Sequence, residues 1–312
     1  MTKRDYLSGL ELSSRETLKL LERTAVQKQE TAAGKHRKSL AGKSLALLFE
    51  KNSTRTRVSF QVGIAQLGGT SIFLSPNDTQ ISRGETVADS ARVLSKYVDG
   101  LIVRTFGHES VTKLAENASI PVINGLTDLH HPCQALADFF TLRERFGRAK
   151  GLKVAYLGDG NNVLHSLLLV GTLIGVNISA ACAPGFEPDE GIVSKSRELA
   201  NASGASVHIT SKVEEACLDA HAVYTDVWVS MGQENEAKRR KMALTPYRVT
   251  EKVFQNTDPE AVFMHCLPAH RDEEVESEII DGPRSIVFQQ AENRLHAQKI
   301  LLEMILGDNN GA

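Results

Sequence analysis

The chain has 312 residues, which is more than a single hydrophobic core usually organises, so we expect two domains. Hydrophobic residues make up 41%, charged residues 24% and aromatic residues 5% of the sequence, and these proportions exclude a disordered or membrane-embedded protein. Because 36 Lys and Arg residues stand against 38 Asp and Glu residues, the net charge of -2 excludes a general affinity for nucleic acid or for an anionic membrane.

The first predicted element is an amphipathic helix. It opens at Ser13-Ser14-Arg15-Glu16, which has the pattern of a capping box, and it should end near Gly34. Runs rich in apolar residues then predict strands at 44–49, 70–74, 101–104 and 122–124. Helical spacing predicts helices between them at 54–66, 86–96 and 110–117. This alternation is typical of a parallel sheet with crossover helices.

A helix at 132–146 follows, and we expect it to bridge two domains. A second alternation then predicts strands at 153–157, 178–181, 206–209, 222–224 and 262–264. The helices predicted among them lie at 163–174, 190–202 and 213–218. A last helical stretch, 290–306, should return to the first domain. The predicted fold class is α/β, with two domains, each a parallel sheet flanked by helices and joined by bridging helices.

The domain boundary is expected near the glycines at 147–151. The first domain would contain 1–147 together with the C-terminal helix 290–312, and the second would contain 148–289.

Three further features of the sequence predict the cellular compartment and one part of the protein surface. The cysteines are Cys133, Cys182, Cys217 and Cys266. They are widely spaced, so we expect reduced thiols in the cytoplasm rather than disulfides or a structural zinc site. The stretch 167–176 is too short to span a bilayer, and we expect no targeting segment. The basic run 238–241 follows two glutamates and predicts a solvent-exposed helix face.

Ligands of parallel α/β sheets bind beyond the carboxyl ends of the strands, so the turns there are the candidate sites. The first is Ser53-Thr54-Arg55-Thr56-Arg57, which follows an apolar strand and opens a helix. Free N–H groups at a helix start, hydroxyls and two guanidinium groups can together bind a phosphate. No Gly-x-x-x-x-Gly-Lys-Ser/Thr pattern occurs, which argues against a nucleotide triphosphatase. The alternative, a plain N-cap with solvated arginines, explains the clustering less well.

Two more turns of the first domain carry polar side chains. Arg104 ends an apolar strand and should point into the crevice. His131-Pro132-Cys133-Gln134 opens the bridging helix with Pro at its first position, which would place the imidazole beside the anion. A capping or core histidine is an equally good interpretation of that turn.

In the second domain, Gly158-Asp159-Gly160-Asn161-Asn162 follows a strand as a dinucleotide fingerprint would, yet Val163 stands where the third glycine is needed. Asn162 could instead bind the α-amino or carboxylate group of an amino acid, or the segment could be only a tight turn.

Asp226 begins the segment 226–232, and its carboxylate at a strand end is placed to bind a cation. His265-Cys266-Leu267-Pro268 follows the last strand, where Pro268 could leave preceding carbonyls free to accept from an amine. A free cysteine is more often a core residue than a catalytic one.

Taken in order, these turns resemble the aspartate/ornithine carbamoyltransferase family. Ser53-Thr54-Arg55-Thr56 and His131-Pro132-Cys133-Gln134 match the carbamoyl phosphate motifs that both branches share. Asp226 through Gly232 and His265-Cys266-Leu267-Pro268 match the ornithine branch. The resemblance implies transfer of a carbamoyl group from carbamoyl phosphate to the δ-amine of L-ornithine, giving L-citrulline and phosphate. It also implies no metal or organic cofactor and a cytoplasmic homotrimer with shared active sites.

The resemblance assigns residues to each substrate. Carbamoyl phosphate would be bound by Ser53, Thr54, Arg55, Thr56, Gln80, Arg104, His131, Gln134 and Arg294, with Gln80 lent to the neighbouring subunit. Ornithine would be bound by Asn162, Asp226, Ser230, Met231, Cys266 and Leu267. The catalytic residues would be Arg55, Arg104, His131, Asp226 and Cys266.

Other functions stay open at this point. Putrescine or N-acetylornithine could be the acceptor within the same family. An NAD-dependent dehydrogenase is suggested by the two glycines Gly158 and Gly160, and a two-lobed binding protein without activity is compatible with the fold. Arginine synthesis, including the urea cycle, and arginine breakdown would both use the same chemistry.

Overall fold

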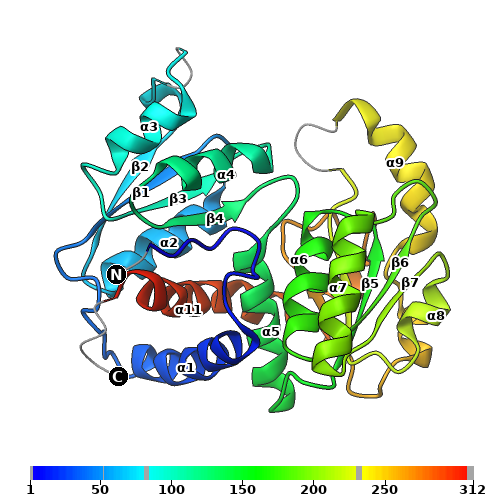
Figure 1. Cartoon of the computed structure of the whole chain (residues 1–312). Helices are drawn as coiled ribbons and strands as arrows, with labels where there is room; N and C mark the ends of the chain where they lie inside the picture. Colours follow the sequence, from blue (N-terminus) through cyan, green and yellow to red (C-terminus); the bar gives the residue numbers. More distant parts are fainter. Residues whose placement is uncertain (1–2, 52, 81–83, 230–233, 308–312) are drawn as a thin grey trace. The chain divides into compact units, whose positions relative to one another are not determined.

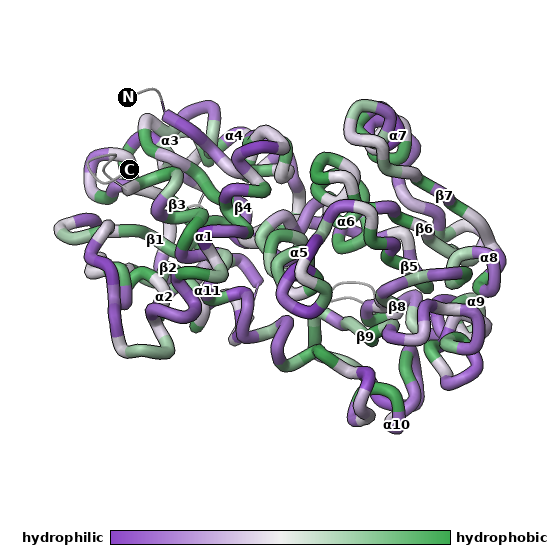
Figure 2. The backbone as a smooth tube through the Cα atoms, turned by 90° about the horizontal axis from the view of Figure 1, so that it is seen from below, coloured by the Kyte–Doolittle hydropathy of each residue, from purple (hydrophilic) through white to green (hydrophobic). Residues whose placement is uncertain are grey.

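The computed structural model describes residues 3–51, 53–80, 84–229 and 234–307. The chain divides into two compact units. Unit 1 is Met1–Phe140 with Asn293–Ala312, and unit 2 is Thr141–Glu292. Hydrophobic and hydrophilic segments alternate along the backbone of both units (Figure 2), as expected where buried strands alternate with helices and loops that reach the surface.

Unit 1 is built on a four-stranded parallel sheet in the order β2-β1-β3-β4 (Figure 1). The strands are β1 (Ser44–Phe49), β2 (Thr70–Leu74), β3 (Gly100–Arg104) and β4 (Val122–Leu126). The helices with most or all of their residues in unit 1 are α1 (Ser14–Ala32), α2 (Thr54–Gln66), α3 (Val87–Leu94), α4 (His108–Asn117), α5 (Pro132–Phe146) and α11 (Val287–Leu306), and η1 (Pro76–Asp78) is a single 3₁₀ turn. Helices α3 and α4 cover one face of the sheet, and α2 covers the other.

Local sequence explains these elements. Ser13 caps α1 in a complete capping box with Glu16, as the sequence predicts. Strand β1 is buried along almost its whole length because helices cover both faces of a parallel sheet, which accounts for its unbroken apolar run. One core layer packs β-strand residues such as Leu48 and Val103 against Val111 and Leu114 of α4.

Unit 2 is built on a five-stranded parallel sheet in the order β7-β6-β5-β8-β9. The strands are β5 (Lys153–Gly158), β6 (Asn177–Cys182), β7 (Val207–Thr210), β8 (Ala222–Thr225) and β9 (Val262–His265). The helices are α6 (Asn162–Leu173), α7 (Glu190–Ser203), α8 (Val213–Cys217), α9 (Ala237–Leu244) and α10 (Ser277–Ile280). Three 3₁₀ helices, η3 (Glu234–Glu236), η4 (Thr245–Tyr247) and η5 (Glu251–Asn256), complete the described part of this unit.

Each sheet reverses its strand order at one point. The chain leaves β1 for β2 on one side and returns to β3 on the other, and it likewise leaves β5 for β6 and returns to β8. In open parallel sheets, ligands bind at such a point, beyond the carboxyl ends of the two strands. The topology therefore places a ligand site beside the ends of β1 and β3 in unit 1, and beside the ends of β5 and β8 in unit 2.

The predicted α/β fold with two parallel sheets is confirmed, and each observed strand lies within two residues of its predicted range. Helix α10 and the 3₁₀ helices were not predicted, because a single turn has no periodicity to read. Within the described ranges, no helix combines the length and apolarity needed to cross a membrane.

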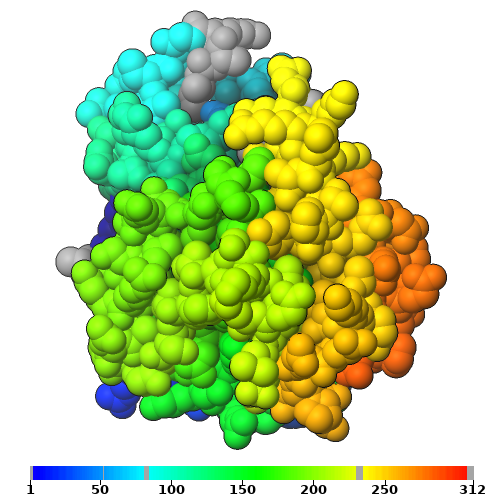
Figure 3. Space-filling model, turned by 90° about the vertical axis from the view of Figure 1, so that its right-hand side faces the viewer, coloured from blue at the N-terminus to red at the C-terminus, as the bar shows by residue number. Residues whose placement is uncertain are grey.

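The prediction of a solvent-exposed face for the basic run 238–241 is wrong at Arg240. Helix α9 lies at the surface of unit 2, in yellow in Figure 3, and Lys238, Arg239 and Lys241 are exposed. Arg240 is only 5% exposed, because it turns inward and forms an ion pair with Asp159. A run of charged residues predicts a solvent-exposed helix face only if none of them forms a buried ion pair with another part of the chain.

Candidate active site

The candidate site of unit 1 begins at the turn between β1 and α2. Ser53 has an extended backbone and caps α2, its hydroxyl accepting from the Thr56 N–H at 3.3 Å. Thr54 and Arg55 are exposed at the helix start, where backbone N–H groups lack helical partners and favour an anion. The predicted phosphate turn therefore has the geometry that such a site needs.

Arg57 does not belong to this turn's anion-binding face. Its guanidinium lies 3.5 Å from the centre of the Phe73 ring, and its Nε donates to Gln61 at 3.1 Å. Of the two guanidinium groups that the sequence offered for a phosphate, Arg57 is engaged by Phe73 and Gln61, so Arg55 is the better candidate.

Thr56 connects this turn to the C-terminal helix. The Thr56 side chain is 1% exposed, and its hydroxyl accepts from Nη2 of Arg294 at 2.8 Å. A Cβ at Gly125 on β4 would lie 3.5 Å from the Thr56 methyl group, which is an ordinary van der Waals contact. The pairing brings together two predicted site residues that are 238 positions apart in the sequence.

His131 is surrounded by positive charge. Its side chain is 4% exposed, and burial, followed by the charges of Arg294, Arg104 and Arg55, holds the pKa of His131 well below its usual value. The imidazole is therefore neutral at pH 7, so one ring nitrogen can donate a hydrogen bond and the other can accept one. Three predicted arginines and the predicted histidine thus act on one another within unit 1.

Gln134 lies one turn further along α5. Its Nε2 donates to Oδ1 of Asp138 at 2.8 Å, which fixes the amide with Oε1 on the opposite side. Oε1 is buried and accepts no hydrogen bond from the described residues. A buried acceptor without a donor is costly, so this oxygen is suited to a ligand N–H group.

The structure shows no contact between Gln80 and the other described residues that are predicted to bind carbamoyl phosphate. It is exposed just beyond η1, and its carbonyl accepts from the Glu85 N–H at 3.1 Å.

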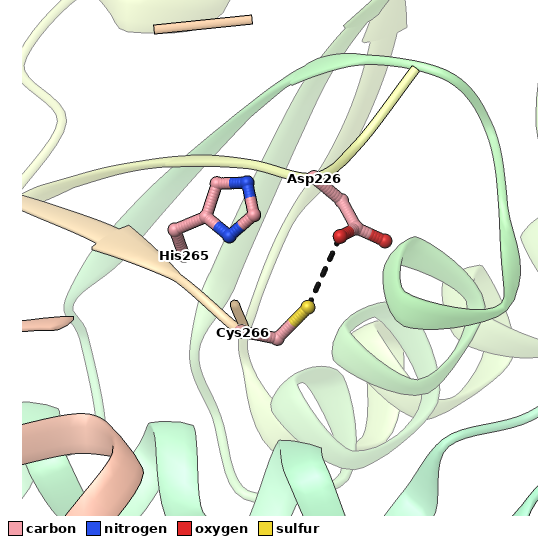
Figure 4. Close-up of side chains that lie close together, drawn as sticks. All are labelled: Asp226, His265 and Cys266. Carbon is pink, nitrogen blue, oxygen red and sulfur yellow. Dashed lines mark hydrogen bonds between the residues drawn. The ribbon is translucent and has the colours of Figure 1, made fainter. Parts of the chain in front are cut away.

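The candidate site of unit 2 is centred on Asp226, directly after β8. Figure 4 shows the Asp226 carboxylate facing the thiol of Cys266, which follows β9, and the Sγ to Oδ1 distance is 3.1 Å. Asp226 is 8% exposed and Cys266 is half-buried. The two predicted residues, 40 positions apart, are therefore paired, and together they can accept from a cationic amine.

Asn161 is a site residue that the sequence interpretation missed in favour of Asn162. Its Nδ2 donates to Oδ2 of Asp226 at 2.7 Å, while its Oδ1 caps α6 by accepting from the N–H groups of Val163 and Leu164. Asn at a position just before an apolar helical run is an N-cap signal that could have singled it out. Asn162 is half-buried as the first residue of α6.

Leu267 has a positive φ of 57°, which is rare for a branched side chain. Its N–H donates to Nδ1 of His265 at 2.8 Å, and Nε2 of His265 lies 3.3 Å from the Glu274 carboxylate. His265 and Glu274 are fully buried. The buried His265 thus stabilises the conformation of the turn that carries Cys266 and Leu267.

Ser230 and Met231, the remaining predicted ornithine-binding residues, lie outside the described residues.

The two glycines that suggested a dinucleotide site have a different explanation. A Cβ at Gly160 would lie 2.2 Å from the Pro188 nitrogen, and the Gly160 N–H donates to the Phe186 carbonyl at 2.7 Å. The backbone of 186–188 therefore occupies the space over this glycine that a bound pyrophosphate would need. Gly158 has a φ of +123°, which only glycine adopts readily.

Two groups of described side chains have donors close enough to bind a metal ion. They are Asp226 with His265 and Cys266, and His270 with Glu273 and Glu274. Imidazole, thiolate and carboxylate are ligands that suit Zn²⁺. In the first group, however, Asp226 already pairs with Cys266 and Asn161, and Nδ1 of His265 accepts from a backbone N–H.

Comparisons with known proteins agree with the division into two halves. Residues 4–144 match the carbamoyl-P binding domain of aspartate/ornithine carbamoyltransferase, and residues 150–305 match the Asp/Orn binding domain of the same family. Ornithine carbamoyltransferase of Anoxybacillus flavithermus is 52% identical over 303 residues, which cover 97% of this chain and 96% of that protein.

Solved structures agree as well. Ornithine carbamoyltransferase from Pyrococcus furiosus has a TM-score of 0.94 at 47% identity, covering 98% of this chain and 97% of that one. Anabolic ornithine carbamoyltransferase from Campylobacter jejuni has a TM-score of 0.91 at 38% identity, covering 97% and 98%. Both domain models, the sequence identity over nearly the whole length and the fold lead to one conclusion. The chain belongs to the aspartate/ornithine carbamoyltransferase family.

Proposed function

We propose that this chain is an ornithine carbamoyltransferase, which transfers the carbamoyl group of carbamoyl phosphate to the δ-amine of L-ornithine and releases L-citrulline and phosphate. The observation that carries the choice of acceptor is the pair of Asp226 and Cys266, 3.1 Å apart at the strand ends of unit 2. A carboxylate beside a thiol suits an amine and would repel the second carboxylate of aspartate. Relatives at about this chain's full length bear the name ornithine carbamoyltransferase.

Unit 1 would bind carbamoyl phosphate. The phosphate would lie at the start of α2, where Ser53, Thr54, Arg55 and Thr56 offer backbone N–H groups, hydroxyls and one exposed guanidinium. Arg104 and Arg294 would add positive charge. The free Oε1 of Gln134 would accept from the carbamoyl NH₂ group, which explains why a buried oxygen has no donor among the described residues.

In the reaction, the neutral δ-nitrogen attacks the carbamoyl carbon, a C–N bond forms, and the bond from that carbon to the phosphate oxygen breaks. Negative charge develops first on the carbamoyl oxygen and then on the leaving phosphate. Neutral His131 would donate an N–H to the carbamoyl oxygen, and Arg104 and Arg55 would stabilise the charge on the phosphate.

The attacking nitrogen arrives as an ammonium group and must lose a proton. Asp226 and Cys266 would orient that group and favour its approach, with the departing phosphate as the final proton acceptor. Asn162, Ser230, Met231 and Leu267 would complete the amino-acid site.

We further infer a cytoplasmic homotrimer in which Gln80 completes the phosphate site of a neighbouring subunit. Gln80 is exposed on the surface of unit 1, where its side chain is available to another subunit, and this supports the role. The four free cysteines fit a reducing compartment. A role in arginine synthesis is supported by relatives that are named anabolic.

A citrulline assay with different acceptors tests the proposal. With carbamoyl phosphate present, L-ornithine should give citrulline, while putrescine, N-acetylornithine and L-aspartate should each react at least about 100-fold more slowly in kcat/KM. Equal rates with one of these acceptors would contradict the assignment of the substrate.

The variant Asp226→Asn tests whether Asp226 acts on ornithine alone. It should lose most of the turnover of ornithine and still bind carbamoyl phosphate with unchanged affinity in calorimetry, because Asp226 belongs to the other unit.

A further inference from the structure

We propose that Arg240 is a positioning residue for amino-acid binding, because it joins the two segments that hold the Asp226 carboxylate in place. The inference rests on the proposed function, since it concerns how the Asp226 site is kept ready for ornithine. Arg240 belongs to α9 and does not itself contact Asp226 in the structure.

Arg240 makes two different contacts with its planar guanidinium. Its Nε donates to the carbonyl oxygen of Trp228 at 2.6 Å, and its Nη2 donates to the carboxylate of Asp159. The side chain is 6% exposed, and its guanidinium carbon lies 5.0 Å from the centre of the Phe186 ring. A rigid fork with several N–H groups can bond two acceptors in different directions at once.

These contacts complete a ring of bonded residues that includes Asp226. Trp228 comes two residues after Asp226, and Asp159 comes two residues before Asn161. Asn161 in turn donates to Oδ2 of Asp226 at 2.7 Å. Arg240 therefore links the chain leaving β8 to the chain leaving β5, as does the hydrogen bond that joins Asp226 to Asn161.

On the β5 side of the ring, Asn161 and Gly160 form further hydrogen bonds that do not involve Arg240. Asn161 caps α6 with two hydrogen bonds of 3.0 and 3.2 Å, and the Gly160 N–H is bonded to the Phe186 carbonyl. On the other side, Thr225 is the last residue of β8 and bonds to the Leu157 carbonyl at 2.8 Å. Asp226 lies just beyond that anchor, so the contact of Arg240 with Trp228 restrains the backbone of 226–228 from its far end.

Arg240 also balances charge in this region. Asp159 is a buried carboxylate whose pKa is raised to about 6, mainly by burial, while Arg240 lowers it and the nearby charge of Asp226 raises it. Without Arg240, the Asp159 carboxylate would lose the cation that offsets its repulsion by the charge of Asp226. A buried ion pair seldom adds much stability, so its use here is best explained by a need for one fixed geometry.

The test compares Arg240→Met with Lys238→Met. Both remove one positive charge from α9, but Lys238 is exposed and outside the site. Arg240→Met should raise the KM for L-ornithine at least about 10-fold, whereas Lys238→Met should leave it within about 2-fold. The Kd of carbamoyl phosphate, measured by calorimetry, should not change in either variant. A KM for ornithine that is the same in both variants would overturn the proposal.

Arg240→Lys keeps the charge and loses the fork, so it should lie between the wild type and Arg240→Met in its KM for ornithine. If Arg240→Met does not fold, this variant decides: a wild-type KM at a lowered melting temperature would mean a purely structural role. L-Norvaline, which lacks the δ-amine, should lose less affinity than ornithine in the same variants. A wild-type protein that makes no citrulline would instead refute the proposed function, so the two failures can be told apart.

Discussion

At His131, burial and three neighbouring guanidinium groups act in the same direction, and both hold the pKa of the imidazole well below its usual value. A charged imidazole would compete with the arginines for the substrate's oxygens. In the proposed reaction, a neutral one would donate a hydrogen bond to the carbamoyl oxygen and would leave the phosphate to the arginines. The same histidine on a solvated turn would titrate near neutral pH and lose this division of roles.

Arg55 and Arg57 offer a matched comparison at the same scale. They are two residues apart at the start of α2 and both are exposed, but Arg57 stacks on Phe73. Replacing Arg55 with Ala should weaken carbamoyl phosphate binding about 10- to 100-fold, as expected for a lost hydrogen bond to a charged group. Arg57→Ala should keep the affinity within about 3-fold, and calorimetry measures both. Equal losses in the two variants would refute the assignment of Arg55.

The element that shapes the amino-acid side is the turn from β5 to α6. Its glycines are needed because Gly158 has a left-handed backbone and because Gly160 touches the backbone of 187–188. The close approach also brings Phe186 beneath Arg240. Backbone packing between two loops thus sets where Asn161 and Asp159 project.

Gly160→Ala should therefore disturb this turn, since the new Cβ would lie 2.2 Å from the Pro188 nitrogen and 2.4 Å from the Glu187 carbonyl carbon. We expect a loss of at least about 2 kcal/mol in the free energy of unfolding, measured with denaturant. Gly107→Ala is the control, because Gly107 has an ordinary φ of -81° and no atom within 4 Å of its Cβ position. It should change stability by less than about 1 kcal/mol. Equal effects would show that 186–188 moves aside freely.

At the scale of the whole molecule, the chain presents two sheets that each reverse their strand order once, with one group of predicted site residues at each reversal. The phosphate residues of unit 1 lie at the ends of β1 and β3 and at the starts of α2 and α5, together with Arg294 of α11. Gln80 stands apart from them on the surface. If it acts on phosphate, it acts in another copy of the chain.

Mixing inactive subunits tests this arrangement. Chains with Gln80→Ala and chains with Arg55→Ala should each be nearly inactive alone. After denaturation and renaturation of an equal mixture, about one quarter of the sites in random trimers would combine an intact Arg55 with an intact Gln80 from the neighbour. Recovered citrulline production near that fraction would support shared sites. No recovery, with trimers present by light scattering, would mean that Gln80 serves its own subunit.

Much of the fold could be predicted because the deciding signals are local. The unbroken apolar run at 44–49 needs both sheet faces covered, and Ser13 with Glu16 specifies a helix start without help from distant residues. The position of polar residues such as Arg104 and Asp226 at strand ends could also be predicted, because each directly follows an apolar run. Side-chain contacts between distant turns could not be predicted, because the periodicity of a sequence carries no information on which turns lie next to each other.

The sequence by itself therefore determined the two parallel sheets, the turns that carry polar side chains, and the resemblance to a carbamoyl-transferring family. Only the tertiary structure decided that Asn161 holds Asp226, that Arg57 is engaged by Phe73, and that Arg240 leaves a basic run to pair with a carboxylate 81 residues away. The reason is physical. Local propensity fixes where helices and strands begin and end, whereas the burial of a charge depends on a partner that only the folded chain brings within hydrogen-bonding distance.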